Sequence, residues 1–394
     1  MESEGIGGNC AEFPSTSMKD SILTIPILPA EFITEILLRV PVKPLLKFRR
    51  VSKSWLALIY SPEFIKTHIR ISANNKYYTH HRLMLRSKCI LKDCSLMSVL
   101  SESVMEVSRL NYPVTNQHKT FWTVVGSVNG LICLSKGANV DLANEKWEKV
   151  EQPCCEEEGV LVLGVLGNNL SVIISRFING FGYDELHDDY KVMRCTYYSS
   201  DVEVQIYCLK SDAWRSIHYL QDGVSFSCPS KFVNGKLYWA NYTDRSFYKS
   251  RYIISINLVD WEKVEQPSYR GDYNLQLGLL SSELSVYINK EKHAYVWVMK
   301  KSWTKLFTVK YADNPDSFAV PFFMSNKGEI VVGFASTFMI YNPKDNSLRP
   351  AIMNSDDWWY TEIYVESLVS PFSTGGTSDA TKTQAEKVQV KTIK

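Results

Sequence analysis

The chain has 394 residues, with 44 lysines and arginines against 42 aspartates and glutamates, and 45% of its residues are hydrophobic. This is the composition of an ordinary globular protein, and the length favours two or three domains. The net charge of +2 excludes a general electrostatic attraction to nucleic acid or to an anionic membrane. No run of about 18 apolar residues is present, so we expect no membrane-spanning helix.

The nine cysteines are an odd number, and none of them has the C-x-x-C spacing typical of zinc and redox sites. The first 21 residues contain no apolar run of signal-peptide length. Both observations favour a reducing compartment, so we expect the protein in the cytoplasm, the nucleus or both. Residues 1–21 are expected to be disordered.

Residues 22–72 have a helical pattern. Apolar residues recur four positions apart over 32–40, which predicts a helix that Pro41 ends. A second short helix follows, and Ser52 is a suitable N-cap for a third. One further turn is expected at 61–65. Three helices in so short a segment bury little surface, so their excess apolar positions need a partner.

Sixteen residues of region 25–70 have a characteristic order and spacing: Leu28, Pro29, Ile36, Leu37, Arg39, Val40, Pro41, Leu45, Phe48, Val51, Lys53, Trp55, Leu58, Ile59, Phe64 and His68. The pattern resembles the F-box, the helical module that docks onto the Skp adaptor of cullin-RING ubiquitin ligases. The resemblance implies that six residues face the adaptor: Leu28, Pro29, Ile36, Leu45, Val51 and Trp55. An internal helical core made by the same residues is the alternative.

Residues 76–370 consist of short apolar or alternating runs separated by turn residues, as in a chain of many short strands. One pattern recurs in this region: a strand, then a polar turn, then a bulky residue that opens the next strand. The bulky residues are Trp214, Trp261, Trp303 and Leu348. These anchors are 47, 42 and 45 residues apart. Such a period is typical of a four-stranded propeller blade, and the body has room for about six or seven blades at most.

The body also has a family resemblance, carried by seven segments: 126–134, 180–184, 189–192, 203–214, 233–239, 301–306 and 363–368. They resemble the F-box-associated interaction domain of plant F-box proteins. That group includes the S-locus F-box proteins of pollen and the F-box proteins that restrain immune receptors. The resemblance implies a propeller-like, kelch-like domain that recognises a protein target.

One segment is repeated within the body. Residues 147–174 share 15 identities in 28 positions with residues 261–288, without a gap, and both begin Trp-Glu-Lys-Val-Glu-Gln-Pro. In the family, a tryptophan-asparagine-proline strand usually stands at the place of the first copy. We therefore hypothesise that a copy of a later blade has replaced part of an early one. A functionally impaired member of the family is then an alternative to a working receptor. Unchanged stability and target binding after deletion of 137–174 would indicate a passive insertion.

No catalytic or cofactor motif is evident, whether a nucleophile elbow, a phosphate loop or a zinc-binding helix, so we expect neither enzymatic activity nor a cofactor. The adjacent His80 and His81 are expected to be solvated in a turn. The run His187-Asp188-Asp189 is expected to be a turn between strands rather than a catalytic or metal site.

The sequence thus predicts an α+β multidomain protein: a disordered N-terminus (1–21), a three-helix F-box (22–72), an all-β propeller-like domain (76–370) and a disordered tail (371–394). The expected function is the substrate receptor of an SCF-type (Skp-cullin-F-box) ubiquitin ligase. Its expected partners are a Skp-family adaptor, through it a cullin and a RING subunit, and a protein target such as an S-RNase or an immune receptor. A propeller that binds a glycan or small ligand, or a propeller hydrolase, is the alternative from another class.

Overall fold

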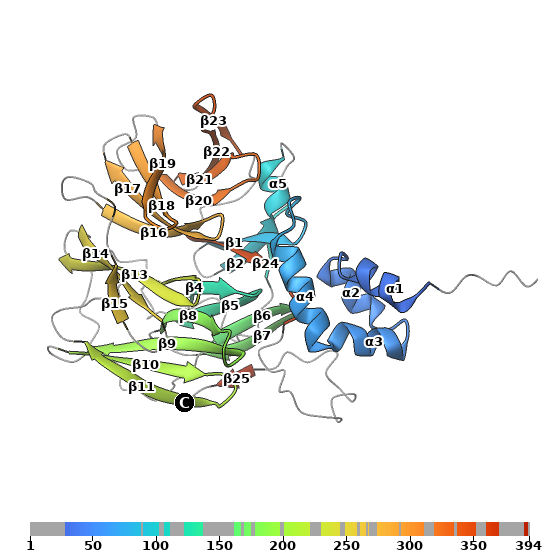
Figure 1. Ribbon diagram of the computed structural model, residues 1–394. Coiled ribbons are helices and arrows are strands. Elements are labelled where there is room, and N and C mark those ends of the chain that lie inside the picture. The colour runs from blue at the N-terminus through green and yellow to red at the C-terminus, as the bar shows by residue number, and fades with distance from the viewer. Residues whose placement is uncertain are drawn as a thin grey trace, which may run out of the picture.

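A computed structural model of the chain describes residues 28–87, 90–101, 106–110, 122–136, 161–166, 169–174, 178–197, 201–220, 230–244, 249–257, 261–264, 267, 274–290, 293–310, 319–334, 337–351, 360–369 and 390–392. A small helical head lies against one side of an all-β body (Figure 1). The segments expected to be disordered, except for 390–392, and the first copy of the Trp-Glu-Lys-Val-Glu-Gln-Pro phrase lie outside the described residues.

The head contains four helices: α1 (Ala30–Leu37), α2 (Val42–Phe48), α3 (Lys53–Tyr60) and α4 (Pro62–Ala73). The side chain of Ser52 accepts a hydrogen bond from the Trp55 N–H at 3.1 Å, and that of Ser61 accepts one from the Phe64 N–H at 3.2 Å. Both helices therefore begin at serine N-caps. The predicted single turn after Ser61 is in fact a helix of 12 residues, because its buried residues recur four positions apart at Phe64, His68 and Ser72.

The described part of the body forms six sheets, numbered here in chain order. The first sheet contains β1 (His81–Ser87), β2 (Ile90–Ser95), β3 (Ser108–Arg109) and β24 (Tyr360–Val365), with α5 (Leu96–Leu100) between β2 and β3. The second contains β4 (Trp122–Val128), β5 (Leu131–Lys136), β6 (Leu161–Leu166), β7 (Asn169–Ile174) and β25 (Val390–Thr392). The third contains β8 (Ile178–Asp184), β9 (Asp189–Tyr197), β10 (Val202–Cys208) and β11 (Ala213–Leu220).

The last three sheets are each made of four consecutive strands. The fourth contains β12 (Lys231–Val233), β13 (Lys236–Asp244), β14 (Lys249–Ile256) and β15 (Trp261–Val264). The fifth contains β16 (Asn274–Leu280), β17 (Glu283–Lys290), β18 (His293–Met299) and β19 (Trp303–Lys310). The sixth contains β20 (Ala319–Met324), β21 (Ile330–Phe334), β22 (Thr337–Asn342) and β23 (Ser347–Pro350).

The sheets close into a propeller. Each sheet contacts the next through the strand at one of its edges, in the order β24, β4, β8, β12, β16 and β20 around the ring. The late strand β24 pairs antiparallel with β1, from His81 opposite Val365 to Arg86 opposite Tyr360. Leu83 on β1 belongs to one buried cluster with Phe338 on β22, so the first sheet also packs against the sixth. The predicted α+β architecture, a helical head followed by a propeller, is therefore correct, with six sheets in the described chain.

The predicted repeat corresponds to the blade. Trp214, Trp261, Trp303 and Leu348 lie at the first or second residue of the last strand in four successive sheets. The turn between the first two strands is also repeated, with left-handed residues at Asn129–Gly130, Asn234–Gly235, Ser281–Ser282 and Gly328. Asparagine, serine and glycine tolerate this backbone better than β-branched residues do, which explains why the turns were visible in the sequence.

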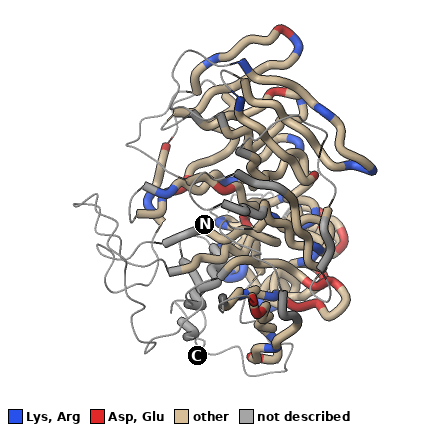
Figure 2. Tube along the Cα trace, turned by 90° about the vertical axis from the view of Figure 1, so that its left-hand side faces the viewer, with Lys and Arg blue, Asp and Glu red and all other residues tan. Residues whose placement is uncertain are grey.

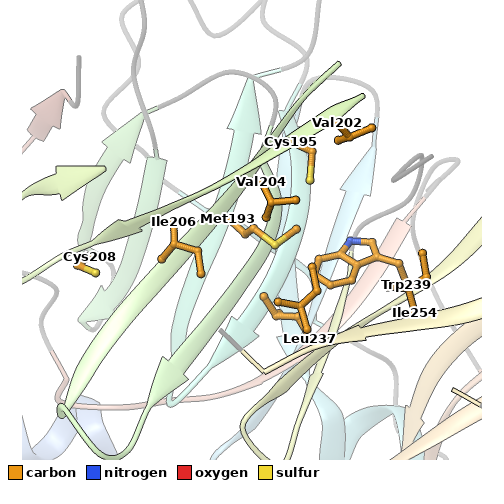
Figure 3. Close-up of a cluster of buried hydrophobic side chains, with 10 residues drawn as sticks. Met193, Cys195, Val202, Val204, Ile206, Cys208, Leu237, Trp239 and Ile254 are labelled. Atoms are coloured by element: carbon orange, nitrogen blue, oxygen red, sulfur yellow. The ribbon is translucent and has the colours of Figure 1, made fainter. Parts of the chain in front are cut away.

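Apolar side chains fill the space between neighbouring blades. In Figure 3, side chains of the third sheet lie against Leu237, Trp239 and Ile254 of the fourth sheet; those labelled on the third sheet are Met193, Cys195, Val202, Val204, Ile206 and Cys208. The indole Nε1 of Trp239 donates a hydrogen bond to the Asn179 carbonyl at 3.0 Å, so its polar atom is satisfied inside the core.

Part of the C-terminal tail is ordered, contrary to the expectation of disorder for 371–394. Strand β25 (Val390–Thr392) pairs in parallel with β7. The physical reason is a local alternation of β-branched and polar residues in Val388-Gln389-Val390-Lys391-Thr392, which favours a strand.

Candidate functional site

The outer face of α1 carries a stripe of exposed apolar side chains. The exposed fractions are 49% for Leu28, 60% for Phe32 and 55% for Ile36. Residues four positions apart lie on one face of a helix, so Phe32 and Ile36 are neighbours, with Leu28 directly before the first turn. The opposite face of α1 is also apolar, since Ile33 and Leu37 pack in the core of the head. A helix that is apolar on both sides has one face left for another molecule.

Two further apolar groups are exposed around α3. Val51, in the turn before α3, is 61% exposed, and Tyr60 at the end of α3 is also exposed. The guanidinium of Arg49 lies 4.1 Å from the centre of the Tyr60 ring and donates a hydrogen bond to its hydroxyl at 3.2 Å. This contact holds the end of α2 against the end of α3 and fixes the Tyr60 ring at the surface.

The six residues predicted to face the adaptor occupy three environments: exposed, intermediate and buried. Leu28, Pro29, Ile36 and Val51 are exposed, as a docking residue must be. Leu45 is fully buried, so the prediction is wrong for this residue. The physical reason is that α2 is short and Leu45 lies on its inward face, where it packs with Leu37 in the core of the head.

Trp55 is intermediate. Its ring is half-buried and meets the Phe48 ring edge-on, with 5.8 Å between the ring centres. It therefore both supports the head and reaches its surface. Phe32, absent from the predicted set, is more exposed than any of its predicted neighbours on α1. Its spacing from Ile36 was the signal that could have identified it.

The head is joined to the propeller by contacts from α4 and the chain that follows it. Leu368, just after β24, lies in the apolar core of the head. Lys66 on α4 forms an ion pair with Asp188 of the β8–β9 turn at 2.9 Å. The Tyr78 hydroxyl accepts a hydrogen bond from the backbone N–H of Asn326 in the β20–β21 turn. The head therefore packs directly against the end of the propeller where these turns lie.

Three histidines are buried at this junction. His68 on α4 makes a hydrogen bond to the Val40 carbonyl through Nε2 at 2.9 Å, and its ring lies edge-on to His80, with 5.5 Å between the centres. His80 and His81 are buried, so the expectation that this pair is solvated is wrong. The backbone explains it: the Glu366 N–H donates to the His80 carbonyl at 2.8 Å, and β1 begins at His81. Burial lowers the pKa of His80 to about 4, with His68 and His81 adding repulsion.

A buried charged network lies beside the junction in the first sheet. The Arg82 guanidinium donates two hydrogen bonds to one carboxylate oxygen of Asp93, at 2.9 and 2.7 Å. The hydroxyls of Ser108 and Tyr364 donate to the same carboxylate at 2.8 and 2.9 Å. Four donors thus compensate for removing Asp93 from water, and the network links strands from both ends of the domain.

No group of three metal-ligating side chains is present among the described residues. As predicted, His187 and Asp188 lie in the turn between β8 and β9. Within the described chain no helix is long and apolar enough to span a membrane. Figure 2 shows basic and acidic residues interspersed along the chain, in agreement with the small net charge.

Comparisons with known proteins agree with this arrangement. Residues 25–67 match the F-box domain, and residues 88–371 match the F-box associated beta propeller domain. An F-box/kelch-repeat protein of Arabidopsis thaliana is 29% identical, over 87% of this chain and 96% of that protein. The F-box protein CPR1 of Arabidopsis thaliana is 25% identical, over 87% of this chain and 88% of that protein.

Likeness to solved structures is more distant. An oligogalacturonate lyase from Vibrio parahaemolyticus is similar at a TM-score of 0.38 and 6% identity, over 68% of this chain and 78% of that one, which is too remote to bear on activity. The family matches together cover most of the helical head and most of the six-sheet body. The chain therefore belongs to the plant F-box proteins that carry an F-box-associated β-propeller domain.

Proposed function

We propose that the protein is the substrate-recognition subunit of an SCF-type ubiquitin ligase. The head binds a Skp-family adaptor and through it a cullin and a RING subunit, while the propeller binds the target protein. The observation that carries the proposal is the stripe of Leu28, Phe32 and Ile36, which the rest of the described chain leaves exposed on a module of the F-box family.

The receptor acts by proximity and has no catalytic group of its own. The target is held near a ubiquitin-charged enzyme supplied by other subunits, which raises the effective concentration of target lysines. The direct packing of head against propeller suits this role. The contacts of Leu368, Lys66 and Asn326 restrict the movement of a bound target relative to the adaptor.

The apolar stripe is large enough to matter for affinity. Full burial of an exposed leucine, isoleucine or phenylalanine contributes about 1.5 to 3 kcal/mol each. Three side chains that are about half exposed therefore contribute on the order of 3 to 4 kcal/mol when an adaptor covers them, or about a hundredfold or more in affinity.

Capture of a purified Skp-family adaptor by the full chain tests the proposal. Phe32→Asp places a charge in the stripe without disturbing the core of the head, and we expect it to abolish capture. Leu306→Asp is the matched control, because Leu306 is an exposed apolar residue on β19 of the propeller. Equal capture by wild type, Phe32→Asp and Leu306→Asp would refute the adaptor-binding role.

The target is identified by a separate experiment. Affinity capture of the chain from plant cells treated with an inhibitor of cullin neddylation stabilises receptor–target complexes for mass spectrometry. An S-RNase, an immune receptor and an unrelated protein are the three outcomes that assign the pathway. We place the complex in the cytoplasm or nucleus, supported by the buried thiols of Cys133, Cys195 and Cys208, which form no disulfide with a described residue.

A further inference from the structure

The duplicated sequence occupies two different places in the propeller. The start of its second copy forms β15 of the fourth sheet, and the later part, from Asn274 on, forms the hairpin β16–β17, the first two strands of the fifth sheet. Its first copy forms the hairpin β6–β7, which follows β4 and β5 in the second sheet. The copied hairpin is thus the first pair of strands in one blade and the last pair of consecutive strands in another.

The two hairpins have the same register. Gly164 lies opposite Ser171 and Leu166 opposite Asn169 in the first copy. The positions 114 residues later pair in the same way, Gly278 with Ser285 and Leu280 with Glu283. The hairpin therefore keeps its pairing, although its surroundings differ.

The second strand of each copy also takes a partner on its other edge, at equivalent positions. In the fifth sheet β17 pairs antiparallel with β18, with Val286 opposite Trp297 and Ile288 opposite Tyr295. In the second sheet the equivalent residues of β7 are Val172 and Ile174, and they pair in parallel with Val390 and Thr392 of β25. Residues 175–185 share no identity with the residues 114 positions later, so the partner strand β18 was not copied.

Without a partner strand, this edge of β7 would be prone to pairing with another chain. The strand reads Asn-Leu-Ser-Val-Ile-Ile from 169 to 174, with no charge and no proline. A strand of this kind with unpaired N–H and C=O groups pairs readily with another chain.

The C-terminus has the sequence of a protective edge strand. Residues 387–394 read Lys-Val-Gln-Val-Lys-Thr-Ile-Lys. The β-branched residues favour extended backbone, and lysines on an edge strand discourage the addition of yet another strand.

We propose that the outer edge of β7 is a peptide-binding site, created by the duplication, whose occupant is the C-terminal segment 387–394 of the same chain. The site takes one extended, lysine-bearing segment in parallel orientation. This segment replaces in the second sheet the strand that the copied hairpin lost, and it keeps β7 from pairing with a second copy of the chain.

Hydrogen–deuterium exchange on a chain ending at Glu386 tests the site. We expect backbone amides of residues 169–174 to exchange about tenfold faster or more, because β7 loses its hydrogen bonds to β25. The parent strand β17 over 283–288 is the control within the same molecule and should be unchanged. A synthetic peptide of residues 387–394 should restore slow exchange at 169–174, and a peptide of the same composition with a scrambled order should not.

Two full-length variants give a second readout. In a strand paired on one edge, alternate residues direct their N–H groups to the partner, and proline removes that donor. Of Val390→Pro and Lys391→Pro, one should speed exchange at 169–174 and the other should not. The proposal is overturned if truncation leaves exchange at 169–174 unchanged, if exchange at 283–288 rises equally, or if both proline variants behave like wild type.

Discussion

Gly130 should be the least replaceable of the turn glycines between first and second blade strands. Its φ is +79°, and a Cβ there would lie 2.3 Å from Cβ of Ser367 and 2.6 Å from the Val365 carbonyl oxygen. Both neighbours belong to the segment of β24 and the residues after it that closes the propeller and continues into the core of the head. The substitution Gly130→Ala therefore strains the turn and pushes against backbone at the closure of the ring.

Two other glycines separate these effects. Gly235 and Gly328 have φ values of +78° and +83° in equivalent turns, and a Cβ at either would meet nothing within 4 Å. Alanine at these positions carries only the left-handed backbone cost, about 1 kcal/mol. At Gly130 the close approach adds about 1 to 3 kcal/mol, so we expect a total loss of about 2 to 4 kcal/mol.

Urea unfolding followed by tryptophan fluorescence measures these free energies of unfolding. The transition of Gly130→Ala should move to a clearly lower urea concentration than those of Gly235→Ala and Gly328→Ala, which should be close to each other. Three equal shifts would refute the reasoning, because they would mean that the contact of Gly130 with the closing segment does not contribute.

Three further outcomes follow from the buried residues. Burial lowers the pKa of His80 from 6.5 to about 4. Between these two pH values the His80 side chain is therefore protonated in the unfolded chain but neutral in the folded chain. The free energy of unfolding should fall by on the order of 2 kcal/mol as the pH drops from 6.5 towards 4, and His80→Leu should flatten this slope in urea titrations. Arg82→Ala should cost about 3 to 5 kcal/mol by leaving the Asp93 carboxylate buried without its cation, and restoration of stability by a second change, Asp93→Asn, would support the cause. Leu45→Ala should lower the melting temperature by creating a cavity that costs about 2 to 5 kcal/mol, whereas Ile36→Ala should leave it unchanged; the reverse order would contradict their assigned places.

The repeat was predictable from the sequence because its signals are local. The bulky residues at Trp214 and Trp303 mark the last strand of a blade, and the turn at Asn234–Gly235 requires left-handed backbone, so each can be identified without knowledge of distant contacts. The F-box pattern was predictable for the same reason, since Ser52 caps α3 within a few residues.

The errors concern residues whose surroundings come from elsewhere in the chain. Which face of the short helix α2 turns inward depends on α1 and α4, so Leu45 could be placed only by the structure. His80 and His81 looked like turn residues, but the closing segment at Glu366 covers them. The strand at Val390 needed β7 as a partner, although its alternating sequence was a usable signal.

The central claim is that the exposed stripe on α1 binds the adaptor, and a titration of a purified Skp-family adaptor against the full chain tests it most directly. We predict that Ile36→Asp raises the dissociation constant by about tenfold or more, while Leu306→Asp binds like wild type. Both variants should retain the wild-type unfolding transition. Binding of unaltered affinity by a folded Ile36→Asp chain would contradict the account.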